Sequence, residues 1–246
     1  MGRVLLNAEN ITKVYSNRRG DNTVLDGLSL QIEEGKFYAI EGESGSGKST
    51  LLSILSGLQK PTGGSVDYTP DDEDSFTISE MEDDELTRLR RHDIVYVPQS
   101  QEVLPNLNVI DNICLVDCFD EDKSKEKGLK AKKLKANKSK STNYENAEME
   151  DVSRLSLILD ELGISELGRE YPSVLSGGEL RRLCIARTLY AEPKIILADE
   201  PTNDLDKDNR DKLRTIFRGI ADKGVAVVVV THDAELAEEA DERIRL

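Results

Sequence analysis

The sequence predicts an α/β protein with a mostly parallel sheet, and three observations lead to this class. Short apolar runs rich in β-branched residues recur along the chain, as expected for strands that are covered on both faces. Segments with apolar residues at helical spacing separate these runs. A glycine-rich turn joins one such strand directly to one such helix within Phe37–Thr50.

The individual elements can be placed in chain order. Two alternating segments within Val4–Ile32, on either side of Asn17–Asn22, predict a hairpin and hence a small antiparallel sheet beside the parallel one. The predicted strands of the parallel sheet are Phe37–Glu41, Ile94–Val97, Ile195–Ala198 and Val225–Val230. The predicted helices are Lys48–Leu58, Leu180–Tyr190, Asp206–Ile220 and Asp233–Ala240.

Composition excludes several classes of protein. The net charge of −15 argues against a protein that coats nucleic acid, because such proteins are normally basic. No apolar run approaches the roughly 20 residues that cross a bilayer, and the first residues contain no stretch typical of a secretory signal. Three cysteines favour a reducing compartment without a disulfide framework, and we expect Cys114 and Cys118 to be partly buried helix residues.

The glycine-rich turn carries a phosphate-binding motif. The segment FYAIEGESGSGKST contains the pattern G-x-x-x-x-G-K-S, formed by Gly42, Gly47, Lys48 and Ser49, between a strand and a helix. Backbone N–H groups of such a turn point at phosphate oxygens, and the helix directs its positive dipole end at the same anion. We expect Lys48 to reach the β- and γ-phosphates of a nucleoside triphosphate and Ser49 to bind Mg²⁺. A GTPase is disfavoured because no N-K-x-D motif occurs.

Two more strands end in residues that suit the same chemistry. The run IILADEP places Asp199 beside the phosphate turn, where it can hold Mg²⁺, and Glu200 where it can polarise an attacking water. His232 follows the strand that ends at Val230, at the carboxyl edge where α/β sites form. We expect a polar contact from His232 to a γ-phosphate.

The segment LSGGE offers a second anion-binding helix start. Ser176, Gly177 and Gly178 can expose backbone N–H groups there, which a single phosphate turn does not require. The segment would be useful if it faced a phosphate on another molecule. The alternative is that Ser176 only caps a helix.

Together these motifs give the chain a specific resemblance. GESGSGKS, VPQS, LSGGE, IILADEP, NDLD and VTH occur in the order and rough spacing of the ATP-binding cassette (ABC) family, and the chain resembles that family from Val4 to Leu246. The resemblance implies a single ABC ATPase domain over residues 1–246, with a P-loop core, an antiparallel β subdomain and an α-helical signature subdomain at about 100–178. It also implies hydrolysis of ATP with Mg²⁺.

The resemblance also assigns roles to individual residues. It implies catalytic roles for Glu200 as the base and for His232, Gln99 and Lys48. It implies that Ser49, Gln99 and Asp199 bind the metal. It implies that Asn203–Asp206 communicates across a dimer. The residues that it implies for nucleotide binding are Tyr15, Gly42, Glu43, Ser44, Gly45, Ser46, Gly47, Lys48, Ser49, Thr50, Ser176, Gly177, Gly178 and Glu179. For Tyr15, which would stack on adenine, the alternative is a structural aromatic of the hairpin.

The resemblance implies partners as well. Members of the family work as head-to-tail pairs, so we expect a homodimer, or a heterodimer with a second ATPase, on the inner face of the cell membrane through a separate transmembrane permease. Ile78–Gln99 is similar to the lipoprotein-release, macrolide-export and cell-division-associated group, which points to export or mechanical work at the cell envelope. One alternative is an ATP-switched interaction module that recruits cell-division or cell-wall partners. Another is a soluble nucleic-acid or ribosome ATPase.

Two charged segments stand apart from these motifs. Asp71–Glu85 holds nine acidic residues and no basic one, whereas Lys123–Lys140 holds nine lysines and one acid. The basic run, within a low-complexity segment at about 119–146, predicts a flexible surface insertion. An alternative is contact with anionic lipid headgroups. This insertion, and Asn203-Asp204 where Gly-Asn is usual, are the departures from the family pattern.

Overall fold

The computed structural model describes residues 2–17, 20–71, 74–118, 149–203 and 205–246. Two compact units make up the chain. The first unit combines Met1–Ser100 with Glu192–Leu246, and the second is the intervening Gln101–Ala191. The expected lysine-rich insertion lies outside the described residues.

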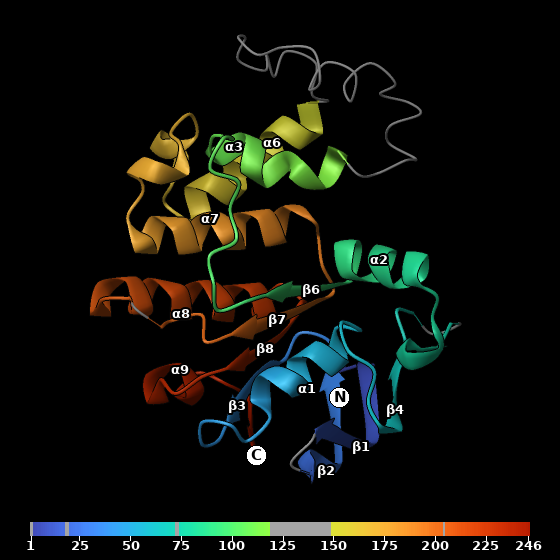
Figure 1. The fold of residues 1–246 in the computed structure, drawn as a ribbon. Coiled ribbons are helices and arrows are strands. Elements are labelled where there is room, and N and C mark those ends of the chain that lie inside the picture. Colours follow the sequence, from blue (N-terminus) through green and yellow to red (C-terminus); the bar gives the residue numbers. More distant parts are fainter. Residues whose placement is uncertain (1, 18–19, 72–73, 119–148, 204) are drawn as a thin grey trace. The chain divides into compact units, whose positions relative to one another are not determined.

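A five-stranded parallel sheet organises the first unit (Figure 1), and its strand order is β6-β7-β8-β3-β9. Every residue of β7 and β8 is buried, which explains why both strands read as continuous apolar runs rather than alternating ones. In this order the strands are β6 (Ile94–Val97), β7 (Ile195–Asp199), β8 (Ala226–Val230), β3 (Phe37–Glu41) and β9 (Glu242–Arg245).

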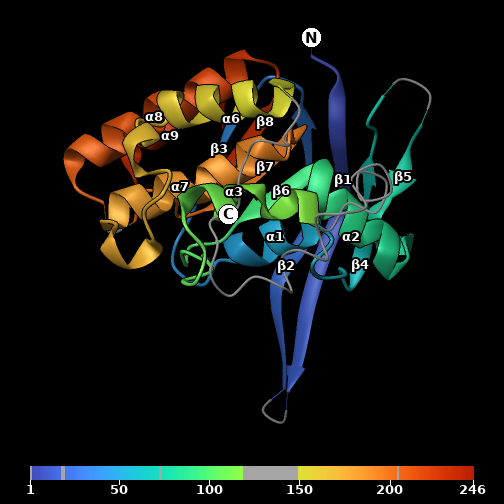
Figure 2. The same ribbon diagram turned by 90° about the horizontal axis from the view of Figure 1, so that it is seen from above.

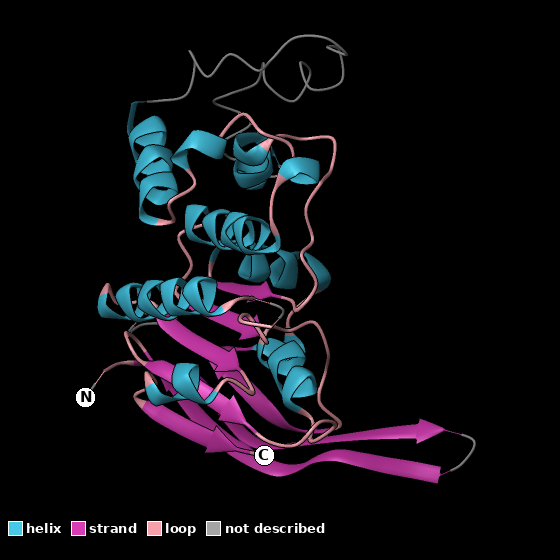
Figure 3. Cartoon of the chain, turned by 90° about the vertical axis from the view of Figure 1, so that its left-hand side faces the viewer, coloured by secondary structure: helices cyan, strands magenta, loops and turns pink. Residues whose placement is uncertain are grey.

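The first unit also contains a four-stranded antiparallel sheet, with the strand order β2-β1-β4-β5. Its two long strands form an extended ribbon, as Figures 2 and 3 show. The ribbon is irregular near Asn10, which adopts a left-handed φ of 52° where the β1–β2 register shifts. The strands are β1 (Val4–Asn17), β2 (Gly20–Glu33), β4 (Gly63–Tyr68) and β5 (Phe76–Thr77).

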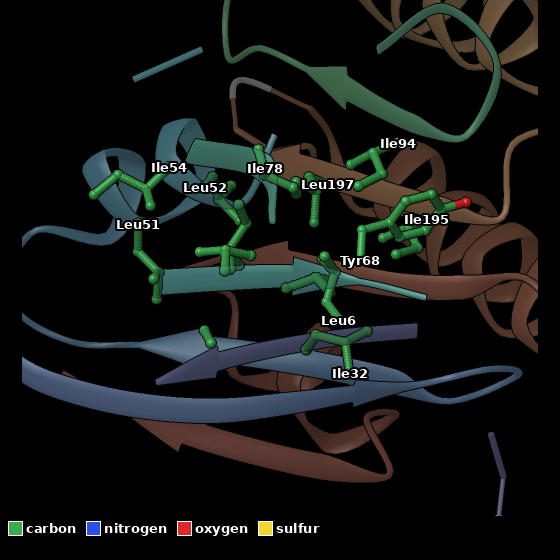
Figure 4. Close-up of a cluster of buried hydrophobic side chains, with 14 of the residues drawn as sticks. Leu6, Ile32, Leu51, Leu52, Ile54, Tyr68, Ile78, Ile94, Ile195 and Leu197 are labelled. Carbon is green, nitrogen blue, oxygen red and sulfur yellow. The ribbon is translucent and has the colours of Figure 1, made fainter. Parts of the chain in front are cut away.

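Helices cover both faces of the parallel sheet. Leu51 and Leu52 of α1 join Leu6, Ile40 and other residues of both sheets in one buried cluster (Figure 4). On the opposite face the ring of Phe37 lies 6.3 Å from that of Phe217 on α8. The helices of the unit are α1 (Lys48–Leu55), η1 (Ile78–Glu80), α2 (Asp83–His92), α8 (Lys207–Asp222) and α9 (Ala234–Glu238).

The second unit is helical, and α7 packs against both α3 and α6 within it. The guanidinium of Arg154 lies 4.4 Å above the Tyr190 ring and donates a hydrogen bond to the Tyr190 carbonyl at 2.6 Å. No helix in the described part of the chain is both long and apolar enough to cross a membrane. The elements of its described residues are α3 (Val109–Ile113), η2 (Cys114–Cys118), α6 (Met149–Glu161), η4 (Ser165–Leu167), η5 (Pro172–Val174) and α7 (Gly177–Tyr190).

The predicted fold class is confirmed, and each predicted strand and helix is present with ends that shift by a few residues. Shifts of three residues occur at the start of α7, which is Gly177 rather than Leu180, and at the end of α1, which is Leu55 rather than Leu58. Gly57 has a left-handed φ of 68° there, and the N–H groups of Gly57 and Leu58 return to the carbonyls of Ile54 and Ser53. This pairing is the Schellman helix end, and a glycine after the last turn is its usual sign.

Candidate nucleotide site

The glycine-rich turn connects β3 to α1 without an intervening side-chain cap. Gly45 and Gly47 have φ values of 85° and 100°, a region that side chains rarely adopt. A Cβ on Gly47 would lie 2.8 Å from the Val24 carbonyl oxygen, and one on Gly42 would lie 2.7 Å from that of Leu246. Glycine is therefore required at these positions for the turn to adopt this conformation.

The polar groups of the turn fit a phosphate chain. Lys48 is only 7% exposed, and its ammonium donates to the carbonyl oxygens of Gly42 at 3.0 Å and Glu43 at 2.8 Å. Both acceptors are neutral carbonyl oxygens. No carboxylate among the described residues forms an ion pair with Lys48, so its positive charge is not neutralised by such a pair. The Ser46 hydroxyl is buried and has no hydrogen-bond partner in the described part of the chain. The start of α1, which includes Ser49, leaves its first N–H groups uncapped.

The carboxylates of β7 lie at the carboxyl edge of the same sheet. Asp199 ends β7, pairs with Val230 of β8, and is 6% exposed. Its Oδ2 accepts a hydrogen bond from the hydroxyl of Tyr96 at 3.2 Å. Glu200 has a left-handed φ of 45°, and its backbone N–H donates to the Val230 carbonyl at 2.9 Å. This unusual backbone, held by β8, turns the chain sharply after the strand.

The structure joins Glu200 to His232, two residues that the sequence analysis placed in one site. The His232 backbone N–H donates to Glu200 Oε2 at 3.2 Å, and His232 Nε2 lies 3.3 Å from Oε1. Burial raises the pKa of the Glu200 carboxyl, although the hydrogen bond from the His232 N–H opposes that shift. The Glu200 side chain is 16% exposed and that of His232 is 57% exposed, so water reaches the pair from the His232 side. A carboxylate with a raised pKa that water can reach suits a general base.

Two other predicted residues also belong to the first unit. Gln99 is exposed and lies two residues beyond the end of β6, the strand next to β7. Tyr15 pairs with Asn22 in the β1–β2 ribbon, whose nearby residue Val24 touches the phosphate turn. The Tyr15 hydroxyl donates to Gln59 at 2.8 Å, and the ammonium of Lys13 lies 5.2 Å from the ring centre. Tyr15 is thus a ribbon aromatic whose ring is 36% exposed.

The LSGGE segment starts α7 in the second unit, and Ser176 does cap that helix. The Glu179 N–H donates to the Ser176 hydroxyl at 3.4 Å, and the Glu179 carboxylate accepts from the Ser176 N–H and hydroxyl, each at 2.7 Å. These bonds lower the pKa of Glu179. Within the described residues, a Cβ on Gly177 would meet no atom within 4 Å, so their packing does not demand a glycine there.

The structure also shows contacts that the sequence analysis did not select. The hydroxyl of Tyr96 reaches Asp199 only because β6 lies next to β7, and these strands are about 100 residues apart in the chain. Asp206 caps α8 by accepting from the Asn209 N–H at 2.9 Å, which gives the predicted cross-dimer loop a fixed end. No pattern in the sequence signals the first contact, whereas the second follows the usual helix-start rule.

Comparison with known proteins decides the family. The ABC transporter family model matches residues 25–203. The chain belongs to the ABC transporter family. The lipoprotein-releasing system ATP-binding protein LolD of Hydrogenovibrio crunogenus is 33% identical over 247 residues, which cover all of this chain and 95% of LolD. The macrolide export ATP-binding/permease protein MacB of Bdellovibrio bacteriovorus is 33% identical over 242 residues, which cover 98% of this chain but only 32% of MacB.

Solved ABC cassettes share the fold of this chain. The dimeric structure of a bacterial ABC transporter cassette aligns with a TM-score of 0.78 and 32% identity, over 98% of this chain and 94% of that one. The same cassette in a post-hydrolysis state with ADP and phosphate aligns with a TM-score of 0.77 and 31% identity, over the same shares. The protein is therefore an ABC-type ATPase that binds adenine nucleotide.

Proposed function

We propose that this ATPase powers a separate transmembrane permease in an export or cell-envelope system, through closure of two cassettes around ATP. The observation that supports the proposal is that the chain has two helix starts suited to an anion, at α1 and at α7, and that they belong to different units. The phosphate turn has a buried lysine and a helix start without a side-chain cap, whereas the LSGGE segment has an exposed glycine, Gly177, that packing among the described residues does not require. A nucleotide on a second cassette would explain that glycine.

The residues of the first unit can divide the work of hydrolysis. The glycine-rich turn and Lys48 would bind the phosphates, and Lys48 would place positive charge where negative charge develops in the transition state. Glu200 would accept a proton from the attacking water, since it is partly exposed and its pKa is raised. His232 would orient Glu200 and contact the γ-phosphate. Tyr15 would stack on adenine.

Mg²⁺ fits the oxygen donors at the edge of the sheet. Ser49 supplies a hydroxyl, Asp199 a carboxylate and Gln99 an amide oxygen, and Mg²⁺ prefers ligands of this kind. A bound Mg²⁺ would neutralise charge on the β- and γ-phosphates. Within the described residues no cluster of three or more His, Cys, Asp or Glu side chains competes as a metal site. Ser49, Asp199 and Gln99 are therefore the proposed ligands.

Closure of the pair would couple the site to the membrane partner. Ser176, Gly177, Gly178 and Glu179 of one cassette would contact the nucleotide held by the other, so ATP would favour the closed state. Gln99 stands at the end of the first unit, and the second unit begins two residues later, at Gln101. That junction would pass closure on to a permease on the cytoplasmic face of the membrane. The relatives named LolD and MacB support an envelope or export role for this chain.

Glu200→Gln tests the chemistry of the proposal, because it removes the base and keeps the size of the side chain. We expect ATP turnover to fall at least a hundredfold while ATP binding, measured by nucleotide fluorescence, stays within about threefold. Glu192→Gln is a matched control, since Glu192 precedes the amino end of β7, whereas Glu200 follows its carboxyl end. Retention of turnover in Glu200→Gln would remove Glu200 as the base.

Co-purification tests the partner. The ATPase, produced at native level in its own cells, should purify from detergent-solubilised membranes with a multi-span permease. Recovery with a cell-division or cell-wall protein and no permease would instead favour the switched interaction module. Recovery with ribosomes or nucleic acid would contradict the proposal altogether.

A further inference from the structure

The outermost strand of the parallel sheet brings an aromatic hydroxyl to the edge where the proposed metal site lies. Tyr96 is the third residue of β6 and pairs with Leu197 of β7 in parallel register. Asp199 lies two residues farther along β7, on the same side of the strand as Leu197. The length of a tyrosine side chain covers this offset, and its hydroxyl donates to Asp199 Oδ2 at 3.2 Å.

Asp199 depends on this hydroxyl for order. It is 6% exposed, and a carboxylate with so little contact to water needs polar partners. Within the described residues, Tyr96 makes the one side-chain hydrogen bond that reaches this carboxylate. That bond engages Oδ2 and leaves Oδ1 to a ligand. Without this bond, no side-chain hydrogen bond from the described residues would set the orientation of the carboxylate.

We propose that Tyr96 is a positioning residue that holds the Asp199 carboxylate in the orientation needed to bind the divalent cation of the site. The proposal rests on the metal-binding role of Asp199 given above. Tyr96 itself binds neither metal nor nucleotide. It acts through Asp199 by fixing which oxygen faces the phosphate turn.

The chemistry of the donor suits this task. A tyrosine hydroxyl is a neutral donor, so it orients a carboxylate without cancelling the negative charge that attracts the cation. An arginine or lysine in the same place would compete with the metal for that charge. Mutation of a residue that hydrogen-bonds to a metal ligand and orients it typically weakens metal binding by about 10- to 100-fold. The strand pairing supplies a rigid base for this contact, because Val97 of β6 is also fixed against Ala198.

Tyr96→Phe removes the hydroxyl and keeps the ring. The matched control is Tyr38→Phe, which removes the hydroxyl of another tyrosine in the same sheet, where Tyr38 accepts a hydrogen bond from the Glu33 N–H at 2.8 Å. Both variants are made in the full chain carrying Glu200→Gln, so that ATP is bound but not consumed. Mn²⁺ affinity is measured by electron paramagnetic resonance with ATP present, and ATP affinity is measured with the divalent cation removed by chelation.

We expect Tyr96→Phe to weaken Mn²⁺ binding roughly tenfold and to leave metal-free ATP binding within about twofold. Tyr38→Phe should change neither quantity, even if it lowers thermal stability more. Unchanged Mn²⁺ affinity in Tyr96→Phe, or an equal loss in Tyr38→Phe, would overturn the proposal. Asp199→Asn separates the two ideas: if it leaves Mn²⁺ affinity unchanged, the metal-binding role of Asp199 fails, whatever Tyr96 does.

Discussion

Gly177→Ala should affect the stability of the fold and the activity of the paired cassettes differently. Gly177 is the first residue of α7, and a Cβ added there would meet no atom of the described residues within 4 Å. Alanine is favoured over glycine by about 0.5–1 kcal/mol inside a helix, and by less at its first position. The free energy of unfolding of Gly177→Ala should therefore stay unchanged or rise by up to about 1 kcal/mol.

The same methyl group should harm the shared site. If the LSGGE backbone of one cassette closes onto ATP bound by another, a Cβ on Gly177 enters space that the nucleotide needs. We expect ATP turnover to fall at least tenfold, which corresponds to about 1.4 kcal/mol of transition-state stabilisation. The loss should be largest at low protein concentration, where pairing limits the rate.

The assay combines urea unfolding with steady-state ATP hydrolysis. Gly47→Ala is the contrasting variant, because its Cβ would lie 2.8 Å from the Val24 carbonyl and its φ is 100°, so it should lose stability by about 1–3 kcal/mol. Wild-type turnover by Gly177→Ala at every protein concentration would refute the reasoning about the shared site. A marked loss of stability in Gly177→Ala would show that the space around Gly177 is not open in the folded protein.

Two further predictions concern the second unit and the base. The side-chain amide of Asn112 is fully buried. It accepts a hydrogen bond from the Leu104 N–H and donates to the carbonyl oxygens of Leu104, Leu107 and Asn108. Asn112→Ala should therefore lower the free energy of unfolding by about 2–3 kcal/mol and remove the hydrogen-exchange protection of the Leu104 amide. Retained protection would show that the loop needs no such support. Because burial raises the pKa of Glu200, the base is protonated at a higher pH than an ordinary carboxyl, so kcat/KM for ATP should fall as pH decreases, with a midpoint above 4.5. A rate that stays constant down to pH 4.5 would contradict this assignment.

Local patterns were enough to predict most of the fold. β7 and β8 are buried on both faces, so their sequences are continuous apolar runs that need no other information. The phosphate turn could be predicted because Gly45 and Gly47 occupy backbone conformations that few other residues tolerate. The ends of α1 and α9 were less accurate, since helix ends depend on returning hydrogen bonds such as that from Leu58 to Ser53.

Contacts that depend on strand order could not be predicted. Tyr96 and Asp199 meet only because the chain returns to β7 after the whole second unit, and no local pattern records that return. The sequence predicts only that Glu200 and His232 each follow a strand, and it predicts neither their contact nor the backbone N–H that holds the carboxylate. The roles given to these residues, and to the LSGGE segment, stay predictions that the experiments above address.

In the proposed pair of cassettes, each ATP is held by the phosphate turn of one cassette and the LSGGE segment of the other. Mixed dimers test it most directly, with Glu200→Gln in both subunits, Lys48→Ala in one, and the ATP retained per dimer counted after rapid gel filtration. With Gly177→Ala in the subunit opposite Lys48→Ala, both changes affect one site, and one ATP should be retained. With both changes in the same subunit, both sites are damaged and none should be retained. The reverse pattern would mean that each cassette uses its own LSGGE segment, and would contradict a nucleotide site shared between two cassettes.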